Sequence, residues 1–463
     1  MAIATINPTT GATEKTFAAH DAQEIERRVA AAASAHRELA ATTFAQRADW
    51  IRAAADLLGE DADALARTMT LEMGKPIAQS RAEIEKCQAA LRFYAENAES
   101  FLAPEELEDP SVASGASRAG ARYQSLGAIL AVMPWNFPLW QVIRFAAPAL
   151  MAGNVGLLKH ASNVPQTALY LDDLFARAGF PRGAFQTLLV GSDAIEDLIA
   201  DERIAAVTLT GSEGAGKAVA AAAAGQIKKS VLELGGSDPF IIMPSADLDK
   251  AVETAVTARV QNNGQSCIAA KRFIVHADVY DAFTEKFVAA LAELTVGDPL
   301  DDGTDVGPIA LQSGLEELEE LVEDATARGA SVLLGGDRGA VADAGEGWFY
   351  PVTVLADIPE EARIVQEETF GPVAALYRAE DREDALRIAN QTEFGLSSSV
   401  WTADEEEIEF FADGIEAGGV FVNGMTASTP HLPFGGIKRS GYGRELAAAG
   451  IREFCNLKTV WVA

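Results

Sequence analysis

Residues 205–224 read AAVTLTGSEGAGKAVAAAAA, and this stretch decides the fold class. An apolar run, a glycine-containing turn and an alanine-rich run follow one another, a pattern typical of a strand, a turn and a helix. The turn is one position short of a phosphate-binding P-loop, because Ala218 stands where a hydroxyl should hold Mg²⁺. The free N–H groups and positive dipole end of such a helix favour an anion. A cofactor pyrophosphate therefore suits the stretch better than a nucleoside triphosphate, and a turn that only packs the helix on the strand is the alternative.

The same alternation of strand and helix extends to both sides of this stretch. Residues 21–100 predict amphipathic helices, the first beginning at Asp21. Strands that alternate with helices predict parallel, doubly wound sheets, and we expect two α/β domains to which the chain contributes end strands. The expected strands cover residues 155–159, 185–190, 205–210, 239–243, 272–276, 331–336, 370–379 and the C-terminal NLKTVWVA.

The composition is that of a strongly acidic globular protein. The chain has 463 residues, of which 49% are hydrophobic, enough for two or three domains with cores. It carries 68 acidic residues against 37 basic ones, a net charge of −31, which argues against nucleic acid and anionic membranes as partners. We expect a cytoplasmic protein adapted to high salt, and an ordinary acidic protein is the alternative.

The few cysteines and histidines indicate the redox compartment and argue against a metal site. Cys87, Cys267 and Cys455 lie far apart, which suits a reducing compartment and not a disulfide framework. The sequence contains neither a CxxC nor an HExxH motif, so we expect no protein-bound metal. The first fifteen residues lack the basic and apolar regions of a signal peptide.

Three residues combine polar chemistry with rigid or apolar surroundings. Cys267 lies in a Gly-Gln-Ser-Cys turn whose backbone donors can lower the thiol pKa, although a lone cysteine is otherwise a small buried hydrophobe. Glu233 ends an apolar run, where a carboxylate is either paired or has a raised pKa and acts as an acid or base. Asn136 lies between two prolines, at a rigid bend from which its amide can donate to an oxyanion.

Six motifs in a fixed order carry a resemblance to a known family. With them the sequence resembles the aldehyde dehydrogenase superfamily along essentially the whole chain, and within it the shorter succinate-semialdehyde dehydrogenases. The resemblance implies an aldehyde dehydrogenase-like α/β fold with two doubly wound domains and a small bridging β segment. The motifs are PWNFP (134–138), TGSEGAG (210–216), ELGG (233–236), GQSC (264–267), EETFGPV (367–373) and PFGGIKRSGYGRE (433–445).

The resemblance also implies the domain boundaries and the reaction. Residues 1–112 and 134–232 correspond to a dinucleotide-binding domain and residues 233–430 to a catalytic domain. Residues 113–133 and 446–463 correspond to bridging strands, which implies a homodimer or homotetramer. The implied reaction is the NAD(P)-dependent oxidation of an aldehyde, here succinate semialdehyde, to the carboxylic acid.

Each motif residue takes a role from the resemblance. Cys267 matches the nucleophile, which forms a thiohemiacetal and then a thioester. Asn136 and the Cys267 backbone N–H match the oxyanion hole, and Glu233 matches the base that activates water for thioester hydrolysis. Lys217 is expected to be a solvated charge. The implied cofactor-binding residues are Trp135, Lys159, Ser162, Gly211, Ser212, Gly216, Glu368 and Phe370, and the implied substrate-binding residues are Arg144, Gln261 and Ser428.

Two departures from the family pattern leave specificity open. Ser162 stands where NAD-preferring members often carry a glutamate, so NADP is allowed and the choice between NAD and NADP stays open. Arg144 matches an arginine that binds the distal carboxylate, whereas Gln261 stands where some relatives have a second arginine. The alternatives are a dehydrogenase for another aliphatic or aromatic aldehyde, an acylating enzyme that Glu233 argues against, a thiol esterase and a non-catalytic binding protein.

The net charge of −31 yields a first prediction. Raising KCl from about 0.1 M to about 3 M should raise the melting temperature, because a Debye length of ~3 Å at 1 M screens the repulsion among excess carboxylates. Thermal unfolding followed by circular dichroism at constant pH measures this. A flat or falling melting temperature would contradict adaptation to high salt.

Overall fold

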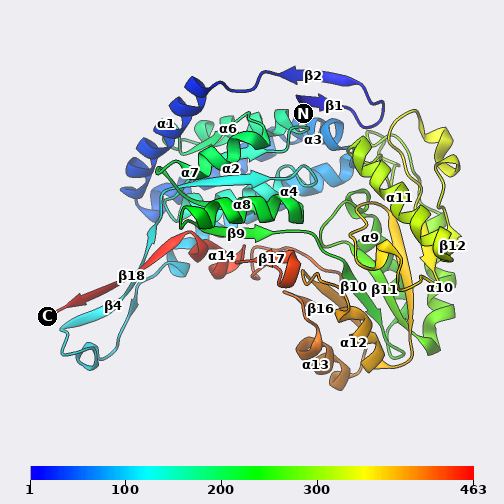
Figure 1. Ribbon diagram of the computed structural model, residues 1–463. Helices are drawn as coiled ribbons and strands as arrows, with labels where there is room; N and C mark the ends of the chain where they lie inside the picture. The colour runs from blue at the N-terminus through cyan, green and yellow to red at the C-terminus, as the bar shows by residue number, and fades with distance from the viewer. Residues whose placement is uncertain (1) are drawn as a thin grey trace.

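Two open sheets, each flanked by helices, form the body of the computed structural model, which describes residues 2–463 (Figure 1). The chain completes most of the first sheet, crosses to the second through residues 234–237, and returns at its C-terminal end. A three-stranded sheet projects from the first unit as an arm. A two-stranded N-terminal sheet, β1 (Ile3–Ile6) with β2 (Thr13–Phe17), lies over the helices of the first unit, away from the arm.

The first sheet has six strands in the order β17-β9-β8-β5-β6-β7. All neighbours are parallel except β17, which runs antiparallel on the edge of β9. The order reverses between β5 and β8, because the chain adds β6 and β7 on one side of β5 and β8 and β9 on the other. Ligands of doubly wound sheets bind at the carboxyl ends of the strands beside such a reversal. The strands are β5 (Ala128–Met133), β6 (Val155–His160), β7 (Phe185–Thr187), β8 (Ile204–Thr210), β9 (Lys229–Glu233) and β17 (Gly441–Tyr442).

The second sheet has seven strands in the order β12-β13-β14-β11-β10-β15-β16. Only the pairing of β12 with β13 is antiparallel. Its central strands are buried on both faces, which is why they appear in the sequence as continuous apolar runs. The strands are β10 (Asp238–Ile242), β11 (Ala270–His276), β12 (Ser331–Leu334), β13 (Thr353–Ala356), β14 (Val373–Ala379), β15 (Ser398–Trp401) and β16 (Val420–Val422).

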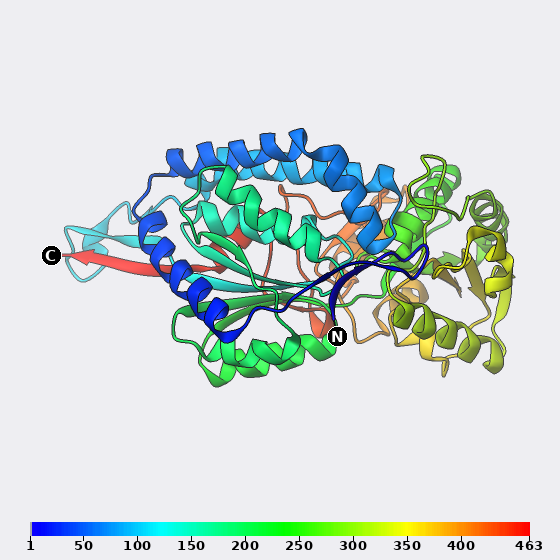
Figure 2. The ribbon, with the colours of Figure 1, turned by 90° about the horizontal axis from the view of Figure 1, so that it is seen from above.

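Helices lie on both sides of the first sheet, as the view from above shows (Figure 2). Asp21 caps the first of them by accepting a hydrogen bond from the Glu24 N–H at 2.8 Å, as the sequence predicts. The helices of this unit are α1 (Ala22–Ala40), α2 (Phe44–Glu60), α3 (Ala62–Met73), α4 (Ile77–Phe101), α5 (Trp140–Met151), α6 (Pro165–Arg177), α7 (Ile195–Ala200), α8 (Glu213–Gly225) and α14 (Ala447–Glu453). Those around the second sheet are α9 (Leu248–Val260), α10 (Ala277–Ala292), α11 (Gln312–Arg328), α12 (Arg382–Asn390) and α13 (Glu405–Gly414).

The projecting arm, seen in Figures 1 and 2, joins segments from distant parts of the chain. Strand β18 (Cys455–Val462) pairs antiparallel with β4 (Arg118–Ser125) along its whole length, and β3 (Glu105–Glu106) completes the sheet. The C-terminal strand expected from the sequence thus finds its partner in β4.

The expected strands of the two main sheets are confirmed, with differences at their ends. Strands were expected to continue to residues 190 and 336, but β7 ends at Thr187 and β12 at Leu334. The ranges expected for the bridging strands, 113–133 and 446–463, are longer than the arm. Residues 128–133 form β5 inside the first sheet, where apolar residues are buried, and residues 447–453 form α14. Within residues 2–463, no helix combines the length and apolar character needed to cross a membrane.

Candidate active site

A cavity of about 800 Å³ lies between the carboxyl ends of the first sheet and the amino ends of the second. From the first sheet, β5, β8 and β9 end directly before PWNFP, at Thr210 and at Glu233. From the second, the segments before β11 and β14 carry Cys267 and Glu368. All six sequence motifs therefore supply residues to one cavity, the last of them through Arg439. Its lining includes Trp135, Asn136, Gln141, Thr210, Gly211, Ser212, Leu234, Gly235, Gln265, Cys267, Glu368 and Phe370.

The turn that carries Cys267 is held in an unusual backbone conformation. Asn262 and Asn263 both have φ of 59°, and Gly264 has φ of 72°. Asparagine and glycine are the residues that adopt this left-handed region most readily. A Cβ added to Gly264 would lie 2.4 Å from the carbonyl oxygen of Gly371, so glycine alone lets the GQSC turn pack against the EETFGPV segment.

Burial controls the thiol of Cys267. It raises the pKa of the thiol to about 12, while the charges of Arg144 and Lys271 act in the opposite direction. The expectation that the turn lowers this pKa is therefore wrong, because the cost of burying a thiolate exceeds what the neighbouring charges return. Loss of this proton therefore requires a base.

Lys271 links the Cys267 turn to Glu368, a link that no sequence motif predicted. Its ammonium is 1% exposed and donates to the carbonyl oxygens of Ser266 and Cys267 at 2.9 and 2.8 Å. The same nitrogen forms an ion pair with Glu368 at 2.8 Å. Lys271 therefore fixes the Cys267 turn relative to a carboxylate on the cavity wall. The only sequence signal is its position four residues after the cysteine.

The side chain of Asn136 is fixed from the second unit. Its Nδ2 donates to the carbonyl oxygen of Gln265 at 3.1 Å. In return, Asn262 Nδ2 donates to the carbonyl oxygens of Asn136 and Gln265, each at 2.9 Å. The structure thus brings the predicted oxyanion donor beside the turn that carries Cys267.

The bend that carries Asn136 rests on a buried ion pair. Lys75 and Glu83 pair with each other while 1% and 2% exposed, and Lys75 Nζ lies 3.4 Å from the Asn136 carbonyl oxygen. Glu83 Oε1 accepts hydrogen bonds from the N–H groups of Leu139 and Trp140, at 2.9 and 2.7 Å. A carboxylate at the start of α5 is favoured by the helix dipole and by these free N–H groups.

Glu233 is a buried carboxyl group without a hydrogen-bond partner. It is 2% exposed, and neither of its side-chain oxygens finds a donor among residues 2–463. Burial, and next the nearby Glu445, raise its pKa well above the ordinary value, while Arg144 opposes them. Of the two alternatives that the sequence left open, a paired carboxylate or one with a raised pKa, the structure favours the second. Glu233 lies directly before Leu234 and Gly235, which line the cavity, but does not line it itself.

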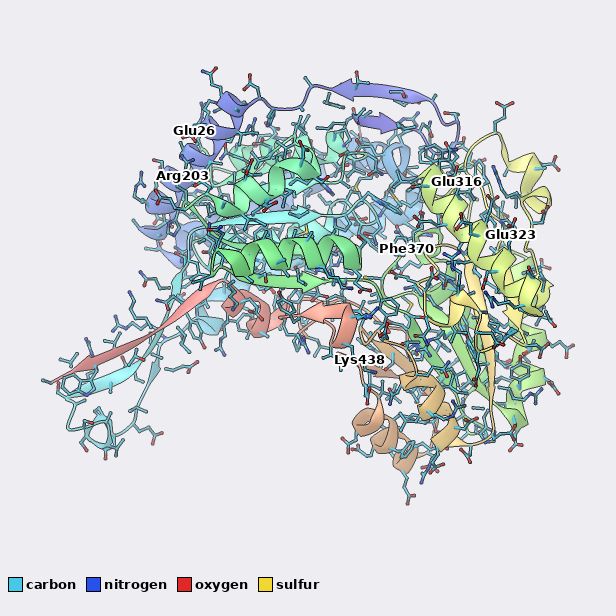
Figure 3. All side chains as sticks on the ribbon, viewed as in Figure 1. Glu26, Arg203, Glu316, Glu323, Phe370 and Lys438 are labelled. Carbon is cyan, nitrogen blue, oxygen red and sulfur yellow. The ribbon has the colours of Figure 1, made fainter. Side chains whose placement is uncertain are left out.

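One group of predicted cofactor-binding residues lines the cavity. Trp135 and Phe370 meet edge to face with ring centroids 5.7 Å apart, and Figure 3 shows Phe370 between the two units. Gly211 and Ser212 stand on the wall where α8 begins, and Ser212 caps that helix by accepting from the Ala215 N–H. Gly216 is buried against Leu234. A thirteen-residue helix opening on the cavity is suited to a cofactor pyrophosphate.

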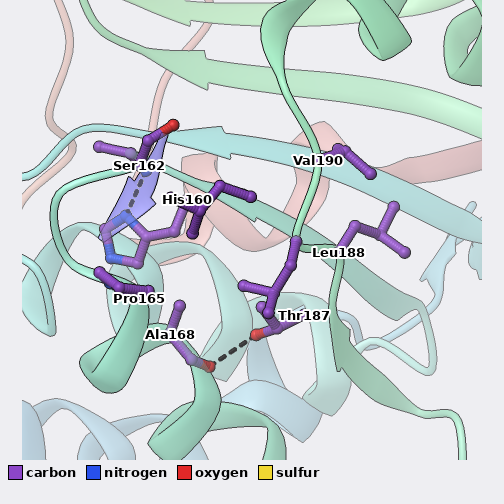
Figure 4. Close-up of a pocket in the computed structure, with 10 residues that line it drawn as sticks. His160, Ser162, Pro165, Ala168, Thr187, Leu188 and Val190 are labelled. Carbon is purple, nitrogen blue, oxygen red and sulfur yellow. Dashed lines mark hydrogen bonds between the residues drawn. The ribbon is translucent and has the colours of Figure 1, made fainter. Parts of the chain in front are cut away.

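The other predicted cofactor-binding residues lie farther along the same edge. Ser162 lines a small separate pocket with His160, Leu188 and Val190, at the carboxyl ends of β6 and β7 (Figure 4). Lys159, on β6, has a pKa lowered by burial. Neither Lys159 nor Ser162 lines the large cavity. Lys217, on α8, is 68% exposed and pairs with Glu213, as expected of a solvated charge.

The three predicted substrate-binding residues occupy different surroundings. Arg144 is 2% exposed, pairs with Glu445, and donates to Thr210 Oγ1 at 3.3 Å. Ser428 is buried and accepts hydrogen bonds from two side chains described below. Gln261 is exposed at the end of α9. None of the three lines the large cavity.

Comparisons with known proteins agree with this geometry. The model of the aldehyde dehydrogenase family matches residues 1–460. A Mycobacterium tuberculosis protein named succinate-semialdehyde dehydrogenase (NADP(+)) 1 is 62% identical over 466 residues, covering 100% of both chains. The solved structure of succinic semialdehyde dehydrogenase from Streptococcus pyogenes in complex with NADP+ is 34% identical, covers 100% of both chains and has a TM-score of 0.95. A succinate-semialdehyde dehydrogenase structure from Burkholderia pseudomallei is 34% identical, with a TM-score of 0.95, and covers 100% of this chain and 95% of that one. The chain belongs to the aldehyde dehydrogenase family.

Proposed function

We propose that the protein oxidises succinate semialdehyde to succinate with NADP+ as hydride acceptor. One observation carries the proposal: the cavity joins a cysteine, an oxyanion donor, a helix N-terminus and the Glu368–Phe370 segment on shared walls. The names of the Mycobacterium and Streptococcus proteins support the choice of substrate and cofactor.

The residues of this chain divide the chemistry between them. Cys267 Sγ attacks the aldehyde carbon, and the Asn136 amide with the Cys267 N–H stabilises the developing oxyanion. The nicotinamide, when bound, accepts the hydride. Glu233 then takes a proton from the water that hydrolyses the thioester on Cys267. Its raised pKa makes it a stronger base than an exposed glutamate, provided that it first loses its own proton.

The cofactor site extends from the large cavity to the pocket beside Ser162. Trp135 and Phe370 would enclose the nicotinamide end with Glu368 on the ribose, and Gly211, Ser212 and Gly216 would meet the pyrophosphate. Lys159 and Ser162 would hold the adenosine ribose. Ser162 carries no charge to repel a 2′-phosphate, which favours NADP.

The resemblance to the family also supports proposals for the roles of the domains, for the oligomeric state and for the cellular compartment. Residues 1–112 with 134–232 would bind the dinucleotide, and residues 233–430 would carry the nucleophile. The arm exposes Leu457, Trp461 and Val462, between 38% and 54%, and would join copies into a homodimer or homotetramer. Exposed carboxylates such as Glu316 and Glu323 on α11 (Figure 3) suit a salt-rich cytoplasm.

A second candidate is an aldehyde without a distal carboxylate. Arg144 already has a carboxylate partner in Glu445, so its charge is compensated before any substrate arrives. This observation favours an aliphatic or aromatic aldehyde, and the Arg144 prediction below separates the two candidates.

Replacing the nucleophile should abolish turnover. The Cys267→Ala variant is expected to lose dehydrogenase and esterase activity while binding of NADP+ by calorimetry stays unchanged, because the thiol attacks the substrate and does not hold the cofactor. Cys455→Ala is the matched control and should keep full activity. Esterase turnover that persisted in Cys267→Ala would identify another nucleophile.

Replacing the base should separate the two halves of the reaction. Glu233→Gln should still form reduced cofactor once per site and then stall, because only thioester hydrolysis lacks its base. A stopped-flow absorbance trace is expected to show a burst followed by slow turnover. A trace without a burst would place Glu233 in an earlier step.

Removing the arginine should alter specificity. Arg144→Leu is expected to lower kcat/KM for succinate semialdehyde on the order of 10²-fold, and that for butanal far less, because a charge-assisted hydrogen bond is worth ~1.5–3 kcal/mol. The double variant with Glu445→Gln avoids an unpaired buried carboxylate. Equal losses for both substrates in the double variant would make Arg144 structural.

A further inference from the structure

Lys86 is a partly buried lysine near Cys267, and the mechanism proposed above does not use it. It lies on α4, and its Nζ donates to Ser428 Oγ at 3.1 Å. The same nitrogen lies 4.1 Å from the ring centroid of Trp140. Trp140 Nε1 also donates to Ser428 Oγ, at 2.9 Å, and Trp140 and Ser428 are 2% and 5% exposed. The partly buried Lys86 thus forms one polar cluster with the buried side chains of Ser428 and Trp140.

The charge of this lysine is not compensated by a carboxylate. Lys75, Lys271 and Arg144 each form an ion pair, with Glu83, Glu368 and Glu445. Within the described part of the chain, no carboxylate lies within 4.0 Å of Lys86 Nζ. A buried cation without a counterion is costly, so its surroundings favour the arrival of an anion.

The cluster lies beside the large cavity without lining it. Trp140 is four residues after Asn136, and Arg144 is four residues further, so Trp140 and Arg144 share one face of α5. Gln141, next to Trp140, lines the large cavity. The charges that act on Lys86 include those of Arg144 and Cys267, which places its ammonium among the groups around the nucleophile.

We propose that Lys86, together with Ser428, binds the distal carboxylate of the semialdehyde substrate. This inference rests on the proposed function and adds a specificity-determining residue to it. Gln261, at the position where some relatives carry a second arginine, is exposed and away from the cavity. Lys86 on α4 would supply the second cation instead. The first cation, Arg144, already forms an ion pair with Glu445.

Burial gives this cation a measurable signature. It lowers the pKa of Lys86 to about 8. The groups that act on its charge are Cys87 and Glu83 on α4, Arg144 on α5, and Cys267. A lysine that titrates near this pH loses its charge as the pH rises above about 8, and with it the attraction for a carboxylate.

The test compares two substrates in one variant. Lys86→Met removes the charge but keeps the length of the side chain. Its kcat/KM for succinate semialdehyde is expected to fall about 10- to 100-fold, with butanal changing less than about twofold. Lys86→Arg should recover most of the loss. Lys250→Met, which removes a lysine that is 73% exposed, is the matched control and should change neither value. Equal losses for both substrates would make Lys86 structural and overturn the proposal.

The pH dependence of substrate preference distinguishes a binding role of Lys86 from a structural one, because a structural role would not make the preference depend on pH. The measured quantity is the ratio of kcat/KM for succinate semialdehyde to kcat/KM for butanal. In this ratio the titration of groups that act on both substrates, including Cys267 and Glu233, cancels. This ratio should fall as the pH rises through about 8 in the unaltered protein and stay flat in Lys86→Met. A flat ratio in both proteins would contradict the proposal.

The outcomes separate this inference from the proposed function. If the unaltered protein prefers succinate semialdehyde and Lys86→Met keeps that preference, only the role of Lys86 fails. If the unaltered protein shows no preference over butanal, the substrate assignment fails and the role of Lys86 fails with it.

Discussion

The buried ion pair between Lys75 and Glu83 is the constraint on which the geometry of the site depends. Glu83 accepts the first N–H groups of α5, and Lys75 reaches the carbonyl oxygen of Asn136. Both side chains are almost fully buried, so loss of one partner would leave an uncompensated charge at a cost of about 3–5 kcal/mol. The PWNFP bend is therefore held by helices of the first unit, while Asn262 and Gln265 hold Asn136 from the second.

A second buried charge, that of Lys271, fixes the backbone on the other side of the cavity. Lys271 donates to the carbonyl oxygens of the Cys267 turn and pairs with Glu368, so it fixes that turn relative to Glu368 on the cavity wall. Preorganised donors and charges of this kind stabilise developing charge without reorganising during the reaction. Burial raises the pKa values of both Cys267 and Glu233, so each group holds its proton more tightly than it would in water.

The sequence predicted the sheets and the motif residues because both depend on short-range pattern. Strands such as β8 and β11 are continuous apolar runs, and a doubly wound order brings their ends together. The sequence carries no comparable sign that a charged side chain is removed from solvent. From the pattern alone, Lys86 and Lys271 would both be expected on the solvent-exposed surface. The pairing of β18 with β4 joins segments too distant for a local pattern, and only the family resemblance assigned both segments to bridging strands. The expected lowering of the Cys267 pKa by its turn left out the energetic cost of burying a thiolate.

Covalent trapping tests the central claim, that the cavity oxidises an aldehyde on Cys267, most directly. The Glu233→Gln protein would be mixed with succinate semialdehyde and NADP+, quenched in acid, digested and examined by mass spectrometry. The account predicts a succinyl thioester on the peptide that contains Cys267 and on neither of the peptides with the other two cysteines. Formation of reduced cofactor and succinate with Cys267 left unmodified throughout the time course would contradict it.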